Sequence, residues 1–112
     1  MQAKKSHLIS DALLIESARQ FAVLSEPSRL LLIRELMAGE RTVTELVNAS
    51  GLKQGNVSKH LAILQQNRFV TSRREGNYVR YAIGDARLFE LCDLMCQRIQ
   101  HDAKAHATRL AG

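Results

Sequence analysis

The sequence predicts a mainly α-helical domain that carries one small β-hairpin, and three observations support this fold class. Apolar residues recur at helical spacing along most of the 112 residues. One segment, residues 69–83, is instead rich in β-branched and aromatic residues. Within it, Glu75-Gly76-Asn77 forms a turn in which Gly and Asn both tolerate positive φ. We therefore expect about five helices and a two-stranded antiparallel projection.

Two helices are expected before residue 40. Ser10 can cap the first, which runs to about Leu24. Its apolar residues recur on one side, namely Leu14, Ala18, Phe21 and Ala22. The second starts after Ser25, because Pro27 suits the first turn of a helix, and Gly39 ends it. The residues expected to bury it are Leu30, Leu31, Ile33, Leu36 and Met37.

Two further short helices are joined by a tight turn. Thr42 or Thr44 begins the first, whose Leu46 and Val47 face inward, and Ser50-Gly51 forms the turn. The second spans residues 54–67. Its Val57, Leu61 and Leu64 are spaced to face the core. Two helices separated by a few residues that include Gly match the helix-turn-helix pattern.

The predicted hairpin follows directly, with strands at residues 69–74 and 78–83. Alternation along the second strand puts one set of side chains on the helices and leaves the other set, which includes Tyr78 and Arg80, exposed. Arg73 and Arg74 flank the turn. A basic hairpin beside a helix-turn-helix is a wing, which reaches the DNA backbone or minor groove while the helix occupies the major groove.

The net charge of the chain is concentrated in this same region. Between Lys53 and Arg80 there are six basic residues and one acidic residue, Glu75, whereas ten basic and ten acidic residues balance elsewhere. The basic residues are Lys53, Lys59, Arg68, Arg73, Arg74 and Arg80. A positive field confined to one segment is typical of a surface that neutralises phosphates, so double-stranded DNA is the expected partner.

Three runs of residues resemble the core of the ArsR/SmtB family of winged helix-turn-helix regulators. They are Thr-Val-Thr-Glu-Leu-Val-Asn-Ala-Ser-Gly-Leu (42–52), Gln-Gly-Asn-Val-Ser-Lys-His-Leu-Ala-Ile-Leu (54–64) and Arg-Arg-Glu-Gly-Asn-Tyr-Val-Arg-Tyr (73–81). The segment Ser-Glu-Pro-Ser-Arg-Leu-Leu-Leu-Ile (25–33) resembles the opening of the family's second helix. The resemblance implies a homodimeric transcriptional regulator, usually a repressor, which leaves its operator when an inducer binds. It also implies that the first and last helices form the dimer contact.

The polar residues of the second short helix and of the wing are the candidate DNA contacts. They are Gln54, Asn56, Ser58, Lys59, His60, Arg73, Arg74, Tyr78 and Arg80. Gln and Asn can read adenine edges, whereas Ser, Lys and His more often hold phosphates. Gly55 departs from the Ser or Thr usual in the family, and it either permits close approach to DNA or loosens the first helical turn.

Residues 1–112 are expected to form a single domain whose terminal helices, 8–24 and 86–108, serve dimerisation. Asp11 and Glu16 interrupt the first apolar stretch, so we expect no signal peptide, no membrane span and a cytoplasmic protein. No phosphate loop or nucleophile elbow is present, so no enzymatic activity is expected. The alternative is a winged-helix module that binds proteins rather than specific DNA.

The candidate residues for an inducer site differ from those of the family's metal sensors. Family members that sense arsenite carry Cys-Val-Cys where this chain has Thr42-Val43-Thr44, and a hydroxyl cannot replace a thiolate for a soft metal. The last helix offers Asp93, His101, Asp102 and His106, whose spacing does not reproduce the family's zinc site. We therefore expect no metal site from these residues, and the roles of His7, His101 and His106 stay open.

Cys92 and Cys96 lie four residues apart in the last helix and permit two interpretations. They share its apolar stripe with Leu88, Phe89, Met95 and Ile99. As buried small apolar side chains they would only pack. Alternatively, a two-fold axis would bring two thiols per subunit together as a site for a thiophilic metal(loid) or for redox modification. No other cofactor is expected.

Overall fold

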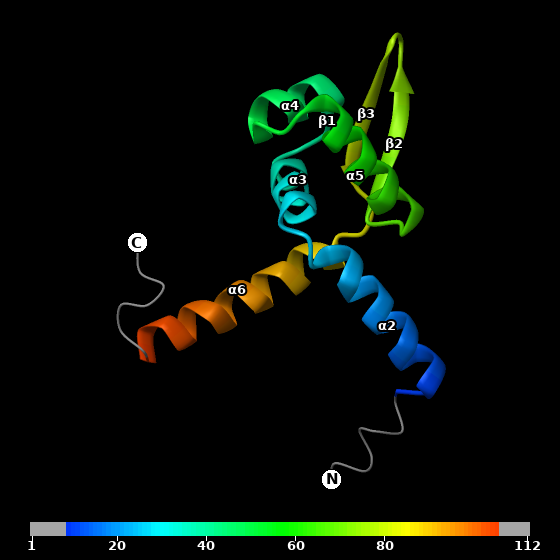
Figure 1. Cartoon of the computed structure of the whole chain (residues 1–112). Helices are drawn as coiled ribbons and strands as arrows, with labels where there is room; N and C mark the ends of the chain where they lie inside the picture. Colours follow the sequence, from blue (N-terminus) through cyan, green and yellow to red (C-terminus); the bar gives the residue numbers. More distant parts are fainter. Residues whose placement is uncertain (1–8, 106–112) are drawn as a thin grey trace.

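The computed structural model of the protein describes residues 9–105, and Figure 1 shows the arrangement of its elements. Within those residues the chain forms five helices and three strands. In chain order these are α2 (Asp11–Leu24), α3 (Pro27–Met37), β1 (Arg41–Thr42), α4 (Val43–Ser50), α5 (Gln54–Gln66), β2 (Val70–Glu75), β3 (Tyr78–Ile83) and α6 (Arg87–Ala105). The mainly α fold class with a hairpin is thereby confirmed.

Side chains cap the helices close to the predicted starts. The Ser10 hydroxyl accepts a hydrogen bond from the Leu13 amide at 3.1 Å, as expected for α2. Pro27 is the first residue of α3, as expected, and the Glu26 side chain caps this helix. Thr42 begins α4 through a reciprocal capping box with Glu45. Residue 8 and residues 106–108 of the predicted terminal helices lie outside the described residues.

The helix-turn-helix is formed by α4 and α5. Gly51 ends α4 in the left-handed conformation, at φ 75°, which glycine adopts without steric cost. Three residues later α5 begins, and its Val57, Leu61 and Leu64 are fully buried. The predicted pair of helices and the inward face of the second are both confirmed.

The sheet has three strands, so the prediction of a two-stranded hairpin was incomplete. The hairpin of β2 and β3 pairs antiparallel, with Arg73 opposite Arg80 and Arg74 opposite Val79. The two-residue strand β1 adds to the free edge of β3, which gives the order β1-β3-β2. In the turn only Gly76 has a positive φ, of 61°. A two-residue strand is too short to show an alternating pattern, so β1 could not be predicted from the sequence.

The core lies between α3, α4, α5 and the base of the sheet, and in α3 it differs from the expectation. The buried residues there are Leu32, Ile33 and Leu36, whereas Leu30 is 42% exposed. Leu88, expected on the dimer face, is instead only 4% exposed and belongs to this core. The run of apolar residues in α3 has no polar interruption to show which side turns inward.

The two outer helices diverge from the base of the domain. Figure 1 shows α2 and α6 running away from the core in different directions, so that most of each helix has no neighbour. Large apolar side chains are consequently exposed along both helices. They are Leu13, Leu14, Ile15 and Phe21 on α2, and Phe89, Leu91, Leu94, Met95 and Ile99 on α6. None of the described helices is both long and apolar enough to cross a membrane.

Candidate nucleic-acid interface

The exposed side of α5 carries most of the predicted contact residues. Gln54, Asn56, Ser58 and Lys59 are all exposed. Helical periodicity places Lys59 on the side of α5 opposite to the buried Val57 and Leu61. A helix held by one apolar face and offering polar side chains on the other has the geometry needed to enter a major groove.

His60 is placed differently from its neighbours. It is half-buried, and its Nδ1 lies 3.3 Å from Nη1 of Arg29 in α3. The ring therefore contacts the body of the domain rather than standing free on the polar face. Helical spacing could have predicted the partial burial of His60, because residue 60 lies next to the buried Val57 and Leu64 on the helix surface.

The two faces of the wing differ in character. Side chains alternate along a strand, so Arg73 and Arg80 share one face while Ser72 and Arg74 share the other. The second face is turned toward α5, because Gln65 Nε2 of that helix donates to Ser72 Oγ at 2.9 Å. Arg74 therefore lies on the same side of the sheet as α5.

The opposite face of the wing holds a group of ion pairs. Arg73 donates to Glu40 at 2.7 Å and to Glu75 at 3.1 Å. Arg80 donates to Glu75 at 2.7 Å and lies 3.6 Å from Glu45. The hydrogen bonds that Glu75 accepts from Arg80 and Arg73 lower its pKa. The hydrogen bonds that Arg73 donates to Glu40 and Glu75 raise the pKa of Arg73.

These carboxylates alter the charge that the sequence predicts for the wing. Glu40 and Glu45 are distant from the hairpin in sequence but contact its arginines in space. Among the described residues, Arg74 is the wing arginine that takes part in no ion pair. The charges along the sequence could not predict these two ion-pair partners. Glu40, just before β1, and Glu45, in the first turn of α4, reach the wing only in the folded structure.

The first turn of α5 has no side-chain cap and is uncrowded. Lys53 is its N-cap residue and makes no capping hydrogen bond through its side chain. Gly55 lies in the first turn, and a Cβ added there would meet no atom within 4 Å. Packing within the described structure therefore does not require glycine at this position.

The thiols have different environments. Cys92 is half-buried and packs against the core, whereas Cys96 is exposed. Burial raises the pKa of the Cys92 thiol, and the neighbouring Cys96 adds to the effect. A raised pKa reduces the thiolate fraction, which is the reactive and metal-binding form.

No group of three or more His, Cys, Asp or Glu side chains within residues 9–105 is placed to hold a metal ion. Thr42, at the position of the family's first thiolate, instead caps α4 and accepts a hydrogen bond from the Glu45 amide at 3.2 Å. His101 is exposed on α6. His7 and His106 lie outside the described residues.

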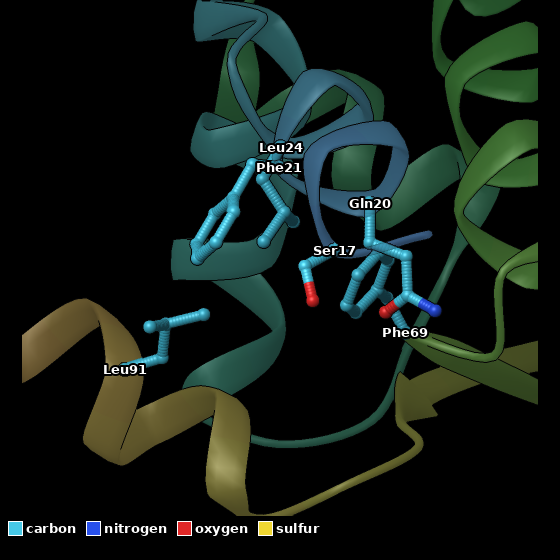
Figure 2. A pocket seen from close by; sticks show the side chains of 6 residues that line it. All are labelled: Ser17, Gln20, Phe21, Leu24, Phe69 and Leu91. Carbon is cyan, nitrogen blue, oxygen red and sulfur yellow. The ribbon is translucent and has the colours of Figure 1, made fainter. Parts of the chain in front are cut away.

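A small hollow of about 130 Å³ lies where α2, α6 and the base of the wing meet. Figure 2 shows the side chains that surround it, which come mainly from α2, with Phe69 and Leu91 closing the other sides. Its lining is mostly apolar and includes Phe21 and Leu24. The hollow is continuous with the exposed apolar residues of the two outer helices.

A helix-turn-helix followed by a basic antiparallel hairpin defines the winged helix-turn-helix class of DNA-binding regulators. The profile of the family described as "Bacterial regulatory protein, arsR family" matches residues 26–72, which contain α3, α4, α5 and the start of the wing. The chain belongs to the ArsR family of bacterial transcriptional regulators.

Two relatives illustrate the similarity in sequence. Over 75 residues the chain is 41% identical to the probable mercury resistance operon repressor of Streptomyces lividans, a match that covers 67% of this chain and 60% of that protein. It is 32% identical over 89 residues to the transcriptional regulator NmtR of Mycobacterium tuberculosis, which covers 80% of this chain and 72% of NmtR.

Solved structures show the same fold. Rv0081 of M. tuberculosis superposes with a TM-score of 0.81 at 27% identity, and the match covers 88% of this chain and all of that chain. A homodimeric winged helix-turn-helix DNA-binding domain, Mb0332 from Mycobacterium bovis, superposes with a TM-score of 0.72 at 28% identity. That match covers 92% of this chain and 96% of the M. bovis domain.

Proposed function

We propose that the protein is a homodimeric transcriptional repressor that binds operator DNA through α5 and the wing. The observation that supports this most strongly is the placement of Arg74 on the side of the sheet that faces α5, beside the exposed polar residues of that helix. One surface thus combines base-reading side chains with a cation for the phosphate backbone.

Within this surface the residues have different roles. Gln54 and Asn56 read bases in the major groove, while Ser58, Lys59 and Arg74 bind phosphates. Arg73, Tyr78 and Arg80 lie on the other face of the wing, so they contact DNA only at the edge of the groove. His60 acts from within the domain, next to Arg29.

The outer helices supply the dimer contact. A monomer would expose five large apolar side chains on α6 alone, and a two-fold axis that pairs α2 and α6 with their counterparts would cover them. Leu94 and Met95 are central to this contact, being 64% and 53% exposed. Residues 1–112 then form one domain per subunit, in the cytoplasm, without enzymatic activity.

The test is selection of DNA by the purified protein from a random-sequence duplex library. We expect enrichment of a pseudo-palindromic site whose half-sites lie about one helical turn apart. Binding should fall steeply with salt, because phosphate contacts release counterions. The alternative, a module that binds only proteins, predicts no enrichment of any sequence. Arg74→Ala should weaken binding to the selected duplex, with Arg34→Ala, at an exposed position of α3, as the matched control.

A further inference from the structure

Arg29 joins three helices. It lies in the first turn of α3, and its Nε donates to the carbonyl oxygen of Val23 near the end of α2, at 2.6 Å. Its Nη1 lies 3.3 Å from Nδ1 of His60 in α5. Because Arg can only donate, His60 Nδ1 is the acceptor in this contact. The two donor groups of one half-buried guanidinium thus hold the end of α2 and the middle of α5.

A second contact joins the same two helices. Arg19 Nη1 of α2 donates to Asn67 Oδ1 at 2.8 Å, and Asn67 is the residue that ends α5. Asn67 is itself fixed, since its Nδ2 donates to the Ile63 carbonyl oxygen at 2.8 Å. Glu16 orients Arg19 on the surface of α2. The two contacts lie at different points along α5, so together they restrain both its position and its rotation.

We infer that Arg29 and Arg19 are positioning residues that fix the recognition helix relative to the dimerisation helix α2. The inference rests on the proposed function, because it needs both a dimer and a DNA site. In a dimer held through α2 and α6, the angle between the subunits fixes where each α2 lies. Because these contacts fix α5 relative to α2, that angle also determines the distance between the two copies of α5. Arg29 and Arg19 would thereby determine which spacing of half-sites the protein accepts.

A residue that positions α5 and a residue that contacts DNA directly affect binding in different ways. A residue that binds phosphate lowers affinity for every duplex, including a single half-site. A residue that only positions α5 leaves the half-site affinity intact and acts when two half-sites must be engaged together. Spacing selectivity, the ratio of affinities for the selected duplex and for one with a single base pair inserted between half-sites, is therefore the decisive quantity.

The experiment measures that ratio by fluorescence anisotropy, with duplexes derived from the site that the wild-type protein selects. We expect Arg29→Lys and Arg19→Gln each to reduce spacing selectivity by about tenfold, within the range usual for coupling between sites. Lys retains the charge at position 29 but has one nitrogen, so it cannot hold Val23 and His60 together. Affinity for the isolated half-site and the dimer dissociation constant should stay within about twofold.

His60 and Arg34 provide the matched variants. His60→Asn keeps an acceptor near the position of Nδ1 and should retain selectivity, whereas His60→Leu should lose it. Arg34→Gln, at an exposed position of α3 whose only ion pair in the described residues is with Glu35, should change nothing. Arg19→Gln lies on the surface, so it keeps the test valid if Arg29→Lys lowers the melting temperature.

Three results would count against the inference. Unchanged selectivity in Arg29→Lys and Arg19→Gln would overturn it while leaving the proposed function standing. An equal loss at half-site and full site would show direct DNA contacts instead. A wild-type protein that selects no duplex would refute the proposed function, and the inference with it.

Discussion

Arg73 of the wing donates to Glu40 at 2.7 Å, and this contact joins the hairpin to the loop that precedes β1. A phosphate and the Glu40 carboxylate compete for the same guanidinium. In the proposed complex the wing therefore meets DNA with Arg73 and Arg80 already engaged in ion pairs and with Arg74 available on the other face.

Removing the Glu40 carboxylate should therefore free Arg73 in part, with Glu75 as its remaining partner. We expect Glu40→Gln to raise affinity for generic duplex DNA and to steepen the plot of log affinity against log salt by up to about 0.9, the value for one phosphate contact. Glu35→Gln, which removes the same charge from α3, is the control for net charge alone. The prediction fails if both variants change the salt slope equally.

Arg74→Ala should have the opposite effect on that slope. We expect a loss of affinity for all duplexes and a slope shallower by about 0.9, since one phosphate contact disappears. Arg73→Ala is the matched comparison, and its effect should be smaller because its guanidinium is held by Glu40 and Glu75. Anisotropy titrations at several salt concentrations give both slopes. Equal losses for the two arginines would show that the ion pairs do not limit Arg73.

Gln54→Ala and Asn56→Ala should reduce the preference for the selected sequence and leave affinity for generic DNA nearly unchanged. Each truncation removes a side chain able to pair with an adenine edge, and should cost about 1–3 kcal/mol at the selected site only. Competition between the selected duplex and versions with single base changes measures this. Lys59→Ala is the contrasting variant, expected to weaken every duplex alike. Unaltered discrimination in both Gln54→Ala and Asn56→Ala would exclude them as base readers.

Two glycines should respond oppositely to alanine. Gly55→Ala places a methyl group in open space within a helix and should raise the free energy of unfolding by about 0.5–1 kcal/mol. At Gly84 the added Cβ would lie 2.8 Å from the carbonyl oxygen of Arg68, so Gly84→Ala should destabilise by about 1–3 kcal/mol. Urea titrations report both values. Loss of stability in Gly55→Ala would contradict the open environment of its first turn.

The thiols should behave as packing residues. Cys92→Ser places a hydroxyl against the core and should cost about 1–2 kcal/mol, whereas Cys96→Ser, at an exposed position, should cost under about 0.5 kcal/mol. We expect operator affinity of the wild-type protein to be indifferent to arsenite and to oxidant. Release of DNA by either reagent, abolished in Cys96→Ser, would instead establish a thiol sensor.

Acid should remove the contribution that the Glu16–Arg19 ion pair on α2 makes to stability. Hydrogen bonds from Arg19 and Gln20 lower the pKa of Glu16 from 4.5 to about 2. A carboxyl whose folded pKa is lowered stabilises the fold above its unfolded pKa, and this contribution disappears as pH falls through the folded value. The melting temperature of Glu16→Gln should therefore differ from wild type near neutral pH and converge with it near about pH 2. Glu90→Gln is the charge-matched control, and a difference that grew on acidification would contradict the ion pair.

Local patterns predicted most of the fold. Ser10, Pro27 and Gly51 mark helix ends through chemistry that acts over a few residues, and the spacing of Val57, Leu61 and Leu64 identified the buried side of α5. Contacts between distant segments could not be found in this way. The pairing of β1 with β3 and the approach of Glu40 to the wing depend on tertiary structure alone.

Arg68 illustrates a different reason for failure. It adopts φ 64° just after Asn67, the residue that caps the end of α5, and Gly or Asn adopts this conformation more readily. Because Arg rarely adopts a positive φ, the left-handed conformation at this position could not be predicted from the residue type. For the interface, the basic residues were recognisable from composition, whereas the distinction between Arg74 and Arg73 required the strand register.

The divergence of α2 and α6 has a consequence for the lifetime of the proposed dimer. Its folding would be linked to protein concentration, because mass action favours the paired state and an unpaired copy exposes apolar helices to proteases and chaperones. The melting temperature should rise as protein concentration rises. Newly made copies at low concentration would be degraded quickly. Only above the concentration at which they pair would the copies become long-lived, so the amount of regulator would rise more than in proportion to its synthesis.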